Sequence, residues 1–187
     1  MHKRSDKNSH IDTILYEIDM LRHCAANIGK TKALKDTSEF YEGEYYLCIE
    51  GFLLHFRNLL AFFTNRRDKP SDLIINDPEQ WAKRVIDQRE YSDLIKAARG
   101  VNDKHGVEGS SCYAEISKFM QHCTTERYER AKDWAIEQMF GDIEHVLDEF
   151  VKRYAPKERM VTRVLDGNGH STATFKKLPP PRSLGEL

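Results

Sequence analysis

Two segments of the chain combine histidine and arginine in a way that could act on a phosphate ester. The first, IEGFLLHFRNLLAFF (49–63), is the most apolar window of the sequence and includes Arg57. The second, SKFMQHCTTER (117–127), includes His122 and Arg127. A histidine can remove the proton from a ribose 2′-hydroxyl, and an arginine can stabilise the charge that develops on the phosphate. The candidate catalytic residues are therefore His122 as the base and Arg57 or Arg127 as the phosphate stabiliser.

The polar residues of the first segment also fit a structural role. At about 100° per residue, Glu50 and Arg57 lie on one line of a helix, Asn58 lies at the edge of that line, and His55 faces elsewhere. Glu50 and Arg57 are two turns apart, which is too far for a direct contact. A buried charge is costly unless it is paired or hydrogen-bonded. We therefore expect Glu50, His55, Arg57 and Asn58 to form a buried polar network whose partners come from other helices.

The second segment is the expected source of those partners. Residues 111–127 should pack against the first segment, so that the polar groups of both converge on one site. His122 and Arg127 have a competing interpretation as helix-end capping and packing residues. The sequence leaves these two interpretations of His122 and Arg127 open.

A basic turn follows the apolar segment. NRRDK (65–69) contains Arg66, Arg67 and Lys69, and such a run is usually a solvated turn that also complements the negative end of a helix dipole. If the chain binds RNA, these three side chains are the expected phosphate contacts.

Metal chemistry has little support in the sequence. Di-iron bundles use Glu-x-x-His pairs on facing helices, and this chain has only DIEH (142–145), with aspartate in place of glutamate. The four cysteines have no metal-ligand spacing and look like small core residues of a reduced, cytoplasmic protein (Cys24, Cys48, Cys112 and Cys123). We therefore expect no metal and no cofactor.

Amphipathic helices should hold these residues in place. The apolar spacing predicts an all-α bundle of four to six helices in residues 1–155. The expected helices span 10–28, 38–63, 78–88, a short piece near 91–98, 111–123 and 125–154. Residues 156–187 are predicted to be a C-terminal extension, partly extended or disordered, with a hairpin signal around DGNG.

The overall charge argues against a chain-wide attraction to anionic partners, but it does not exclude a partner that binds a local charged patch. A net charge of −1 provides no global field that attracts nucleic acid or an anionic membrane. The apolar run 51–63 is too short and too polar to span a bilayer, so no membrane segment is expected.

The two blocks resemble a family of uncharacterised prokaryotic helical proteins, which is itself similar to HEPN-type bundles. The matching residues of the first block are Glu50, Leu53, His55, Arg57 and Leu59, and those of the second are Lys118, His122, Thr124 and Arg127. The sequence departs from the family pattern at Ser117, where asparagine is expected, and at Cys123, where leucine is expected. The resemblance covers roughly residues 40–153.

This resemblance implies a self-associating bundle protein with a structural or RNA-binding role. HEPN-type proteins are often ribonucleases in which an arginine precedes a histidine by a few residues on one helix. Here the order in 122–127 is reversed, with the histidine first. A metal-independent endoribonuclease of the toxin or phage-defence type is therefore the second expectation, and a metal-binding bundle is the third. The expected partners are a second copy of the chain and RNA.

Overall fold

The structure is a computed structural model of the 187-residue chain, and it describes residues 8–82, 85–121, 134–156, 164–165 and 171–172. His122 and Arg127 lie outside the described residues. The chain divides into two units, Met1–Tyr154 and Ala155–Leu187, and each is described by itself.

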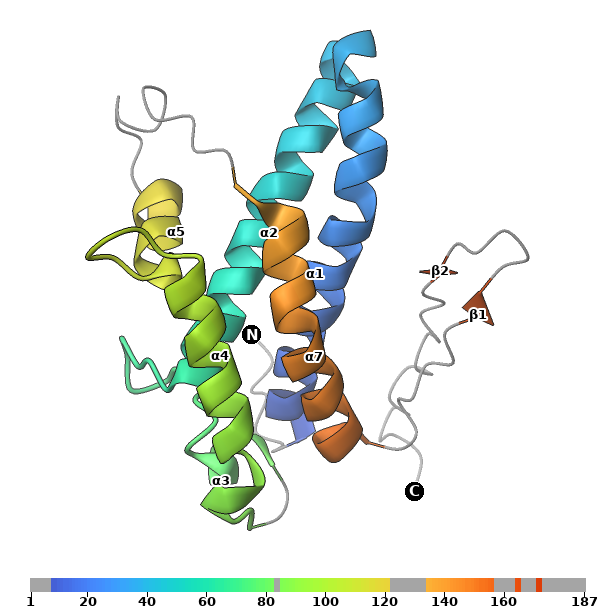
Figure 1. The fold of residues 1–187 in the computed structure, drawn as a ribbon. Helices are drawn as coiled ribbons and strands as arrows, with labels where there is room; N and C mark the ends of the chain where they lie inside the picture. Colours follow the sequence, from blue (N-terminus) through green and yellow to red (C-terminus); the bar gives the residue numbers. More distant parts are fainter. Residues whose placement is uncertain (1–7, 83–84, 122–133, 157–163, 166–170, 173–187) are drawn as a thin grey trace, which may run out of the picture. The chain divides into compact units, whose positions relative to one another are not determined.

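The first unit is an all-α bundle, as predicted (Figure 1). Its α-helices among the described residues are α1 (Asn8–Leu34), α2 (Glu39–Thr64), α3 (Pro78–Trp81), α4 (Ser92–Lys104), α5 (Cys112–Gln121) and α7 (Ile136–Tyr154). Two short 3₁₀ turns, η1 (Lys35–Thr37) and η2 (Gln88–Glu90), precede α2 and α4.

Helix α2 is the central element. It runs antiparallel to α1, and both α4 and α5 pack against it (Figure 1). Its buried side chains lie in its second half (Phe52, Leu53, His55, Phe56, Leu59, Leu60, Phe62 and Phe63). Ser38 caps its start by accepting a hydrogen bond from the Tyr41 N–H, and Asn65 ends it in the left-handed region at φ 63°. The predicted bounds of this helix are confirmed within one or two residues.

The helices α1 and α2 approach closely at Gly51. A Cβ atom at this position would lie 2.8 Å from the sulfur of Cys24 on α1. Such a distance is far below van der Waals contact, so only glycine allows the two helices to pack this tightly.

An aromatic cluster fixes α3 and α7 to the end of α2. The rings of Phe62, Phe63, Trp81, Phe150 and Tyr154 contact one another with centroids 5.0 to 5.8 Å apart. Edge-to-face and tilted arrangements of this kind contribute favourable quadrupole interactions beyond the burial of apolar area. Phe63, Trp81 and Phe150 are fully buried.

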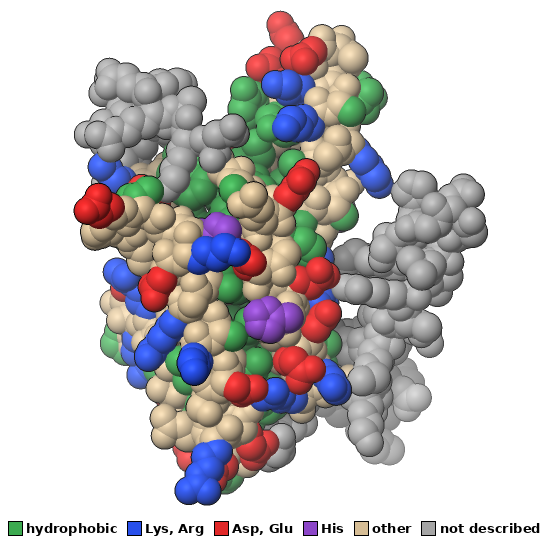
Figure 2. Space-filling model, viewed as in Figure 1, with side chains coloured by type: hydrophobic (Ala, Val, Ile, Leu, Met, Phe, Trp, Pro, Cys, Tyr) green, Lys and Arg blue, Asp and Glu red, His purple; other side chains and the backbone are tan. Residues whose placement is uncertain are grey.

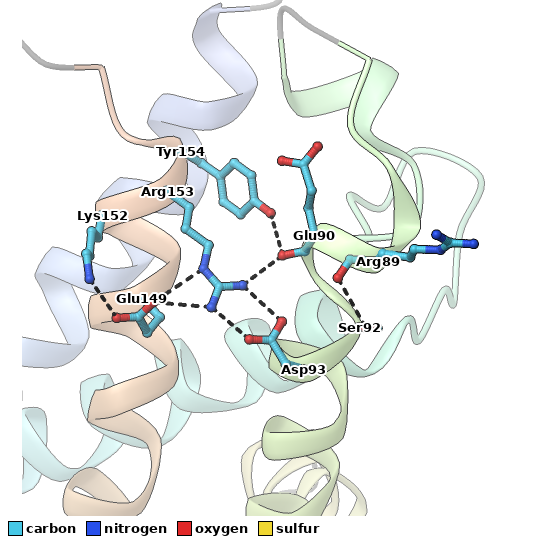
Figure 3. Close-up of polar contacts among 8 residues, drawn as sticks. All are labelled: Arg89, Glu90, Ser92, Asp93, Glu149, Lys152, Arg153 and Tyr154. Carbon is cyan, nitrogen blue, oxygen red and sulfur yellow. Dashed lines mark hydrogen bonds and ion pairs between the residues drawn. The ribbon is translucent and has the colours of Figure 1, made fainter.

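A polar clamp joins α7 to the start of α4 beside this cluster (Figure 3). Arg153 donates two parallel hydrogen bonds to Asp93, at 2.9 and 2.7 Å, and one to the Glu90 carbonyl at 2.7 Å. It also donates to Glu149 through Nε and Nη2, at 3.3 and 3.2 Å. These contacts use all five N–H groups of the guanidinium.

Several helix bounds differ from the prediction. Helix α1 continues through Gly29 to Leu34, because Ile28 is still buried and the Thr31 hydroxyl bonds to the Asn27 and Ile28 carbonyls. Helix α3 ends at Trp81 rather than near Gln88, since Ala82 is extended and a capping box at 87–90 starts the next helical segment.

The other two differences concern α4 and α7. Helix α4 runs to Lys104, well beyond the predicted short piece, because Ala98 and Val101 continue its buried face. Trp134 and Ala135 are not helical and α7 begins at Ile136, whereas the first part of the predicted helix 125–154, residues 125–133, lies outside the described residues.

The second unit contains a short antiparallel pair of strands. β1 (Val164–Leu165) pairs with β2 (Ser171–Thr172), with Val164 opposite Thr172 and Leu165 opposite Ser171. This pairing agrees with the hairpin predicted around the DGNG signal.

The apolar part of α2 extends beyond the run 51–63. By length and composition it could cross a membrane, and it is the one such helix among the described residues. The buried core helix of a soluble protein meets the same criteria, and 44% of the apolar window of α2 is buried within the bundle.

Candidate functional site

A cleft of about 420 Å³ lies where α1, α2, the loop after α2 and α5 meet. Its polar lining includes Thr13 and Glu17 from α1, Arg57 and Asn58 from α2, Arg66 from the loop and Tyr113 from α5. Its volume is within the range of small-ligand sites.

Glu17 organises the α1 wall of the cleft. Its Oε2 accepts a hydrogen bond from His55 Nδ1 at 2.8 Å and one from Asn58 Nδ2 at 3.0 Å. His55 is 8% exposed and lies behind the cleft, whereas Glu17 and Asn58 line it. His55 is therefore a positioning residue here, because its partner and not its own ring faces the cleft.

Glu17 is not among the predicted site residues, although the sequence contains a signal for it. Ile14, Ile18 and Leu21 form the buried stripe of α1, and Glu17 lies at the same helical spacing within that stripe. A carboxylate on the core face of a helix needs a hydrogen-bond partner, and the buried His55 on α2 was also expected to have a partner from another helix.

Tyr113 forms the α5 wall and holds two arginines. The Arg66 guanidinium lies 4.1 Å from the ring centroid, and the Arg57 guanidinium lies 5.6 Å from it. Both distances fit cation–π contacts. The Tyr113 backbone N–H donates to Asn102 Oδ1 of α4 at 2.9 Å, which fixes the start of α5.

Asp68 ties the loop to this wall. The Tyr113 hydroxyl donates to Asp68 Oδ2 at 2.7 Å, and Arg66 Nε donates to Asp68 Oδ1 at 3.4 Å. The Tyr113 hydrogen bond, followed by the nearby charge of Arg66, lowers the pKa of Asp68. Asp68 therefore stays ionised and keeps Arg66 paired.

Arg57 is the exception among these groups. Its Nε is buried and has no hydrogen-bond partner within the part of the chain that the structure describes. The carboxylates that line the cleft already accept hydrogen bonds from other groups: Glu17 from His55 and Asn58, Asp68 from Tyr113 and Arg66, and Asp72 from the Asp68 and Lys69 N–H groups. A buried guanidinium donor without a partner is costly, and an anion in the cleft would satisfy it.

The predicted site residues separate into three groups. Arg57, Asn58 and Arg66 line the cleft. Glu50 and His55 do not line it: Glu50 is half-buried on α2, and His55 acts through Glu17. His122 and Arg127 lie outside the described residues.

The other two basic residues of the turn differ from Arg66. Arg67 pairs with Asp77, with Nη2 3.1 Å from Oδ2, and the Asp77 side chain makes no capping hydrogen bond at the start of α3. Lys69 is exposed beside the cleft rim. Of the three predicted phosphate contacts, Arg66 faces the cleft itself.

The DIEH sequence is not arranged for a metal. Asp142 Oδ2 lies 2.6 Å from Lys104 Nζ and 2.7 Å from His105 Nε2, and these contacts lower the Asp142 pKa. His145 Nδ1 lies 3.0 Å from the Asp142 carbonyl. The described residues contain no group of three His, Cys, Asp or Glu side chains able to hold a metal.

Cys24 and Cys48 have weakly acidic thiols. Burial, and then the nearby Cys48, raises the pKa of the Cys24 thiol to about 11, and burial also raises the pKa of Cys48. Both remain thiols at neutral pH, and the thiol is a poor nucleophile. Cys123 lies outside the described residues.

Comparisons with known proteins leave the family open: no protein-family model, curated protein or solved structure matches this chain. The resemblance to HEPN-type bundles therefore stays a prediction from the sequence.

Proposed function

We propose that this helical bundle binds an anionic ligand in the cleft, with Arg57 as the principal contact, and that the ligand is a phosphate of single-stranded RNA. The observation that carries the proposal is the buried, unpartnered Nε of Arg57 in a lined cleft. Hydrogen bonds to charged groups contribute about 1.5–3 kcal/mol, so one phosphate on this guanidinium would provide much of the binding.

The surroundings of Arg57 support a nucleic-acid phosphate. Arg66 lies on the same aromatic ring, and the exposed Lys69 lies three residues further along the loop. Single-strand binding sites combine cations that follow the backbone with aromatic side chains. RNA is the ligand class that the resemblance of the two sequence blocks implies.

Three carboxylates also border the cleft, and they restrict what it can hold. Glu17, Asp68 and Asp72 would repel an extended polyanion laid across them. We therefore propose that a single phosphate enters at Arg57 while the rest of the strand follows the loop at Arg66 and Lys69. Binding of this kind should be weak and should decrease as salt is added.

The test is the binding of a fluorescently labelled oligouridine RNA, measured by anisotropy. Arg57→Met should weaken binding by about tenfold or more, since it removes a charge-assisted hydrogen bond. Arg99→Met is the matched control, because Arg99 is exposed on α4, outside the cleft, and the charge change is the same. Absence of RNA binding by the wild-type chain, or an equal loss in both variants, would overturn the proposal.

The same samples address the endoribonuclease alternative. RNA that stays intact without metal would leave binding as the function. Cleavage that His122→Ala abolishes would instead favour the enzyme that the sequence blocks predict, with His122 as its base.

A further inference from the structure

One face of the α1–α2 pair exposes large apolar side chains in a regular pattern. Phe40, Leu47 and Leu54 on α2 are seven residues apart, so they lie close to one line along the helix. They are 68%, 63% and 38% exposed. Heptad spacing of exposed apolar residues is typical of a helix that packs against a partner helix.

Two residues of α1 border the same face. Cys24 and Gly51 are the contact residues of the two helices. Antiparallel helices are related by a local two-fold axis, so residues at equal helical angles from their contact residues face the same side. Leu47 and Leu54 lie about 40–60° from Gly51 in one direction, and Tyr16 and Leu34 lie about 80° from Cys24 in the same direction.

We name this surface the open face and define it by Tyr16, Leu34, Phe40, Leu47 and Leu54. Tyr16 and Leu34 are 52% and 41% exposed. The face therefore holds five of the nine large hydrophobic side chains that are exposed within the described residues. The surface over α4 and α7 differs, because there basic and acidic side chains alternate (Figure 2).

Charge is separated between the two helices of this face. Residues 20–35 contain Arg22, Lys30, Lys32 and Lys35 and no acidic residue. Residues 39–54 contain four glutamates, at 39, 42, 44 and 50, and no lysine or arginine. One helix of the pair is thus basic over this length and its neighbour is acidic.

Some of these charges have no ion pair among the described residues. Among the described residues, Arg22 pairs with Asp148 of α7, and Lys35 lies over the Tyr45 ring with Nζ 5.5 Å from its centroid. Lys30 and Glu39 have no ion pair within the described part of the chain. By helical geometry they lie at the two outer edges of the open face, each about 120° from its contact residue.

We propose that the open face is the interface with a second copy of this chain, packed about a two-fold axis. In a two-fold interface residue i of one copy meets residue j of the other, and residue j meets residue i. This places the α1 edge of each open face, with Lys30, over the α2 edge of its partner's open face, with Glu39, and puts the apolar residues between them. The face is complementary to itself in both charge and apolar pattern.

A second copy fits this face better than an anionic membrane. An amphipathic surface that binds lipid has a polar side rich in lysine and arginine. Here the acidic α2 carries most of the apolar stripe, so negative lipids would be repelled from it. The proposal goes beyond ligand binding in the cleft, and its test measures mass rather than ligand affinity.

The first test is the molar mass in solution, measured by sedimentation velocity over a concentration series up to about 100 μM, where even a weak dimer forms. The wild-type chain should dimerise. The double variant Phe40→Ser/Leu47→Ser should raise the dissociation constant by about a hundredfold, since each copy loses the burial of two large apolar side chains. Val107→Ser is the matched control, because Val107 is 48% exposed in the loop before α5 and lies outside the open face.

The second test exchanges the charges. Lys30→Glu alone or Glu39→Lys alone should weaken dimerisation, because each places like charges opposite one another in the homodimer. An equimolar mixture of the two variants should form a heterodimer, since both of its cross-copy contacts then join opposite charges. Native mass spectrometry distinguishes the heterodimer by its mass.

Three results would overturn the proposal. The wild-type chain could be monomeric at the highest concentration, in which case another segment or partner covers the face. The dimer could be unaffected by the double serine variant, which would place the interface elsewhere. The charge variants could weaken the dimer without recovery in the mixture, which would exclude the two-fold arrangement. The circular dichroism of each variant should match the wild type, because the changed side chains are exposed.

Discussion

Two arginines in this bundle lie between helices, but the hydrogen bonding of their guanidinium groups differs. Arg153 joins α7 to the start of α4 with all five N–H groups occupied (Figure 3). Arg57 lies between α2 and α5 over the Tyr113 ring, and its Nε has no hydrogen-bond partner within the described residues. The fully bonded guanidinium of Arg153 is typical of an arginine that stabilises a fold. The unsatisfied donor of Arg57 lowers the stability of the fold and is typical of a binding site.

The same contrast applies to the carboxylates around the two arginines. Asp93 and Glu149 face Arg153, and its hydrogen bonds lower the pKa of both. In the cleft, Glu17 and Asp68 are occupied by His55, Asn58, Tyr113 and Arg66. The cleft carboxylates therefore bond to groups other than Arg57, although its charge also helps to lower the Asp68 pKa, whereas both clamp carboxylates bond directly to Arg153.

The largest expected effect on stability comes from the cleft wall. Glu17→Ala should lower the free energy of unfolding by about 2–3 kcal/mol, because it leaves the buried His55 ring and the Asn58 amide without their acceptor. Chemical denaturation followed by circular dichroism measures this change. Glu17→Gln keeps an acceptor oxygen for both groups and should lose less than half as much. Equal losses would mean that charge, and not hydrogen bonding, holds this wall.

The clamp should give the next largest effect. Arg153→Met should lower the free energy of unfolding by about 1–2 kcal/mol, since it removes a bidentate pair and a bond to a backbone carbonyl from a partly exposed site. Lys152→Met is the control, because Lys152 is 74% exposed and pairs with Glu149 alone at 3.4 Å. The control should change the same quantity by less than about 0.5 kcal/mol.

Arg57 should behave in the opposite way. Without ligand, Arg57→Met should leave the free energy of unfolding within about 0.5 kcal/mol of the wild type or raise it, because the variant removes an unsatisfied buried donor and keeps the apolar stem. Thermal unfolding of Arg57→Met beside Arg153→Met measures the difference directly. A loss as large as that of Arg153→Met would show that Arg57 has a structural partner, and the comparison of the two arginines would then be wrong.

The sequence predicted the bundle and the ends of α2 because both depend on local signals. The apolar spacing in 49–63 and the capping serine are enough to place α2. The helix that starts at Pro78 ends at Trp81 and not near Gln88, because Ala82 is extended and a capping box at 87–90 starts the next helical segment. Helix α4 runs past the predicted end near 98 because Ala98 and Val101 continue its buried face. Tertiary packing overrides a local start signal of this kind.

Helical geometry placed the cleft residues only in part. It separated His55 from Arg57 by direction, and in the structure Arg57 lines the cleft whereas His55 does not and bonds to Glu17. It could not supply Glu17 or Tyr113, because the register between α2 and its neighbours depends on close packing, such as the approach of Gly51 to Cys24. Arg153 was missed for a different reason: its partners are 60 residues away in sequence, and nothing local marks them.

The smallest expected effect is the pH dependence of the clamp, and it also distinguishes the two regions. Ordinary pKa values are 3.8 for Asp93 and 4.5 for Glu149, and Arg153 lowers both in the folded chain. A lowered folded pKa means that the unfolded chain binds protons first as the pH falls. The stability from these groups is therefore complete above pH 4.5 and is lost as the pH falls through the lowered values. Arg153→Met should flatten this part of the stability profile, while Arg57→Met should keep it. The lowered pKa values of Asp68 and Asp142 do not depend on Arg153, so the difference between Arg153→Met and the wild type reports the clamp. If both variants titrate like the wild type below pH 5, the clamp does not hold its carboxylates in the way that its five hydrogen bonds require.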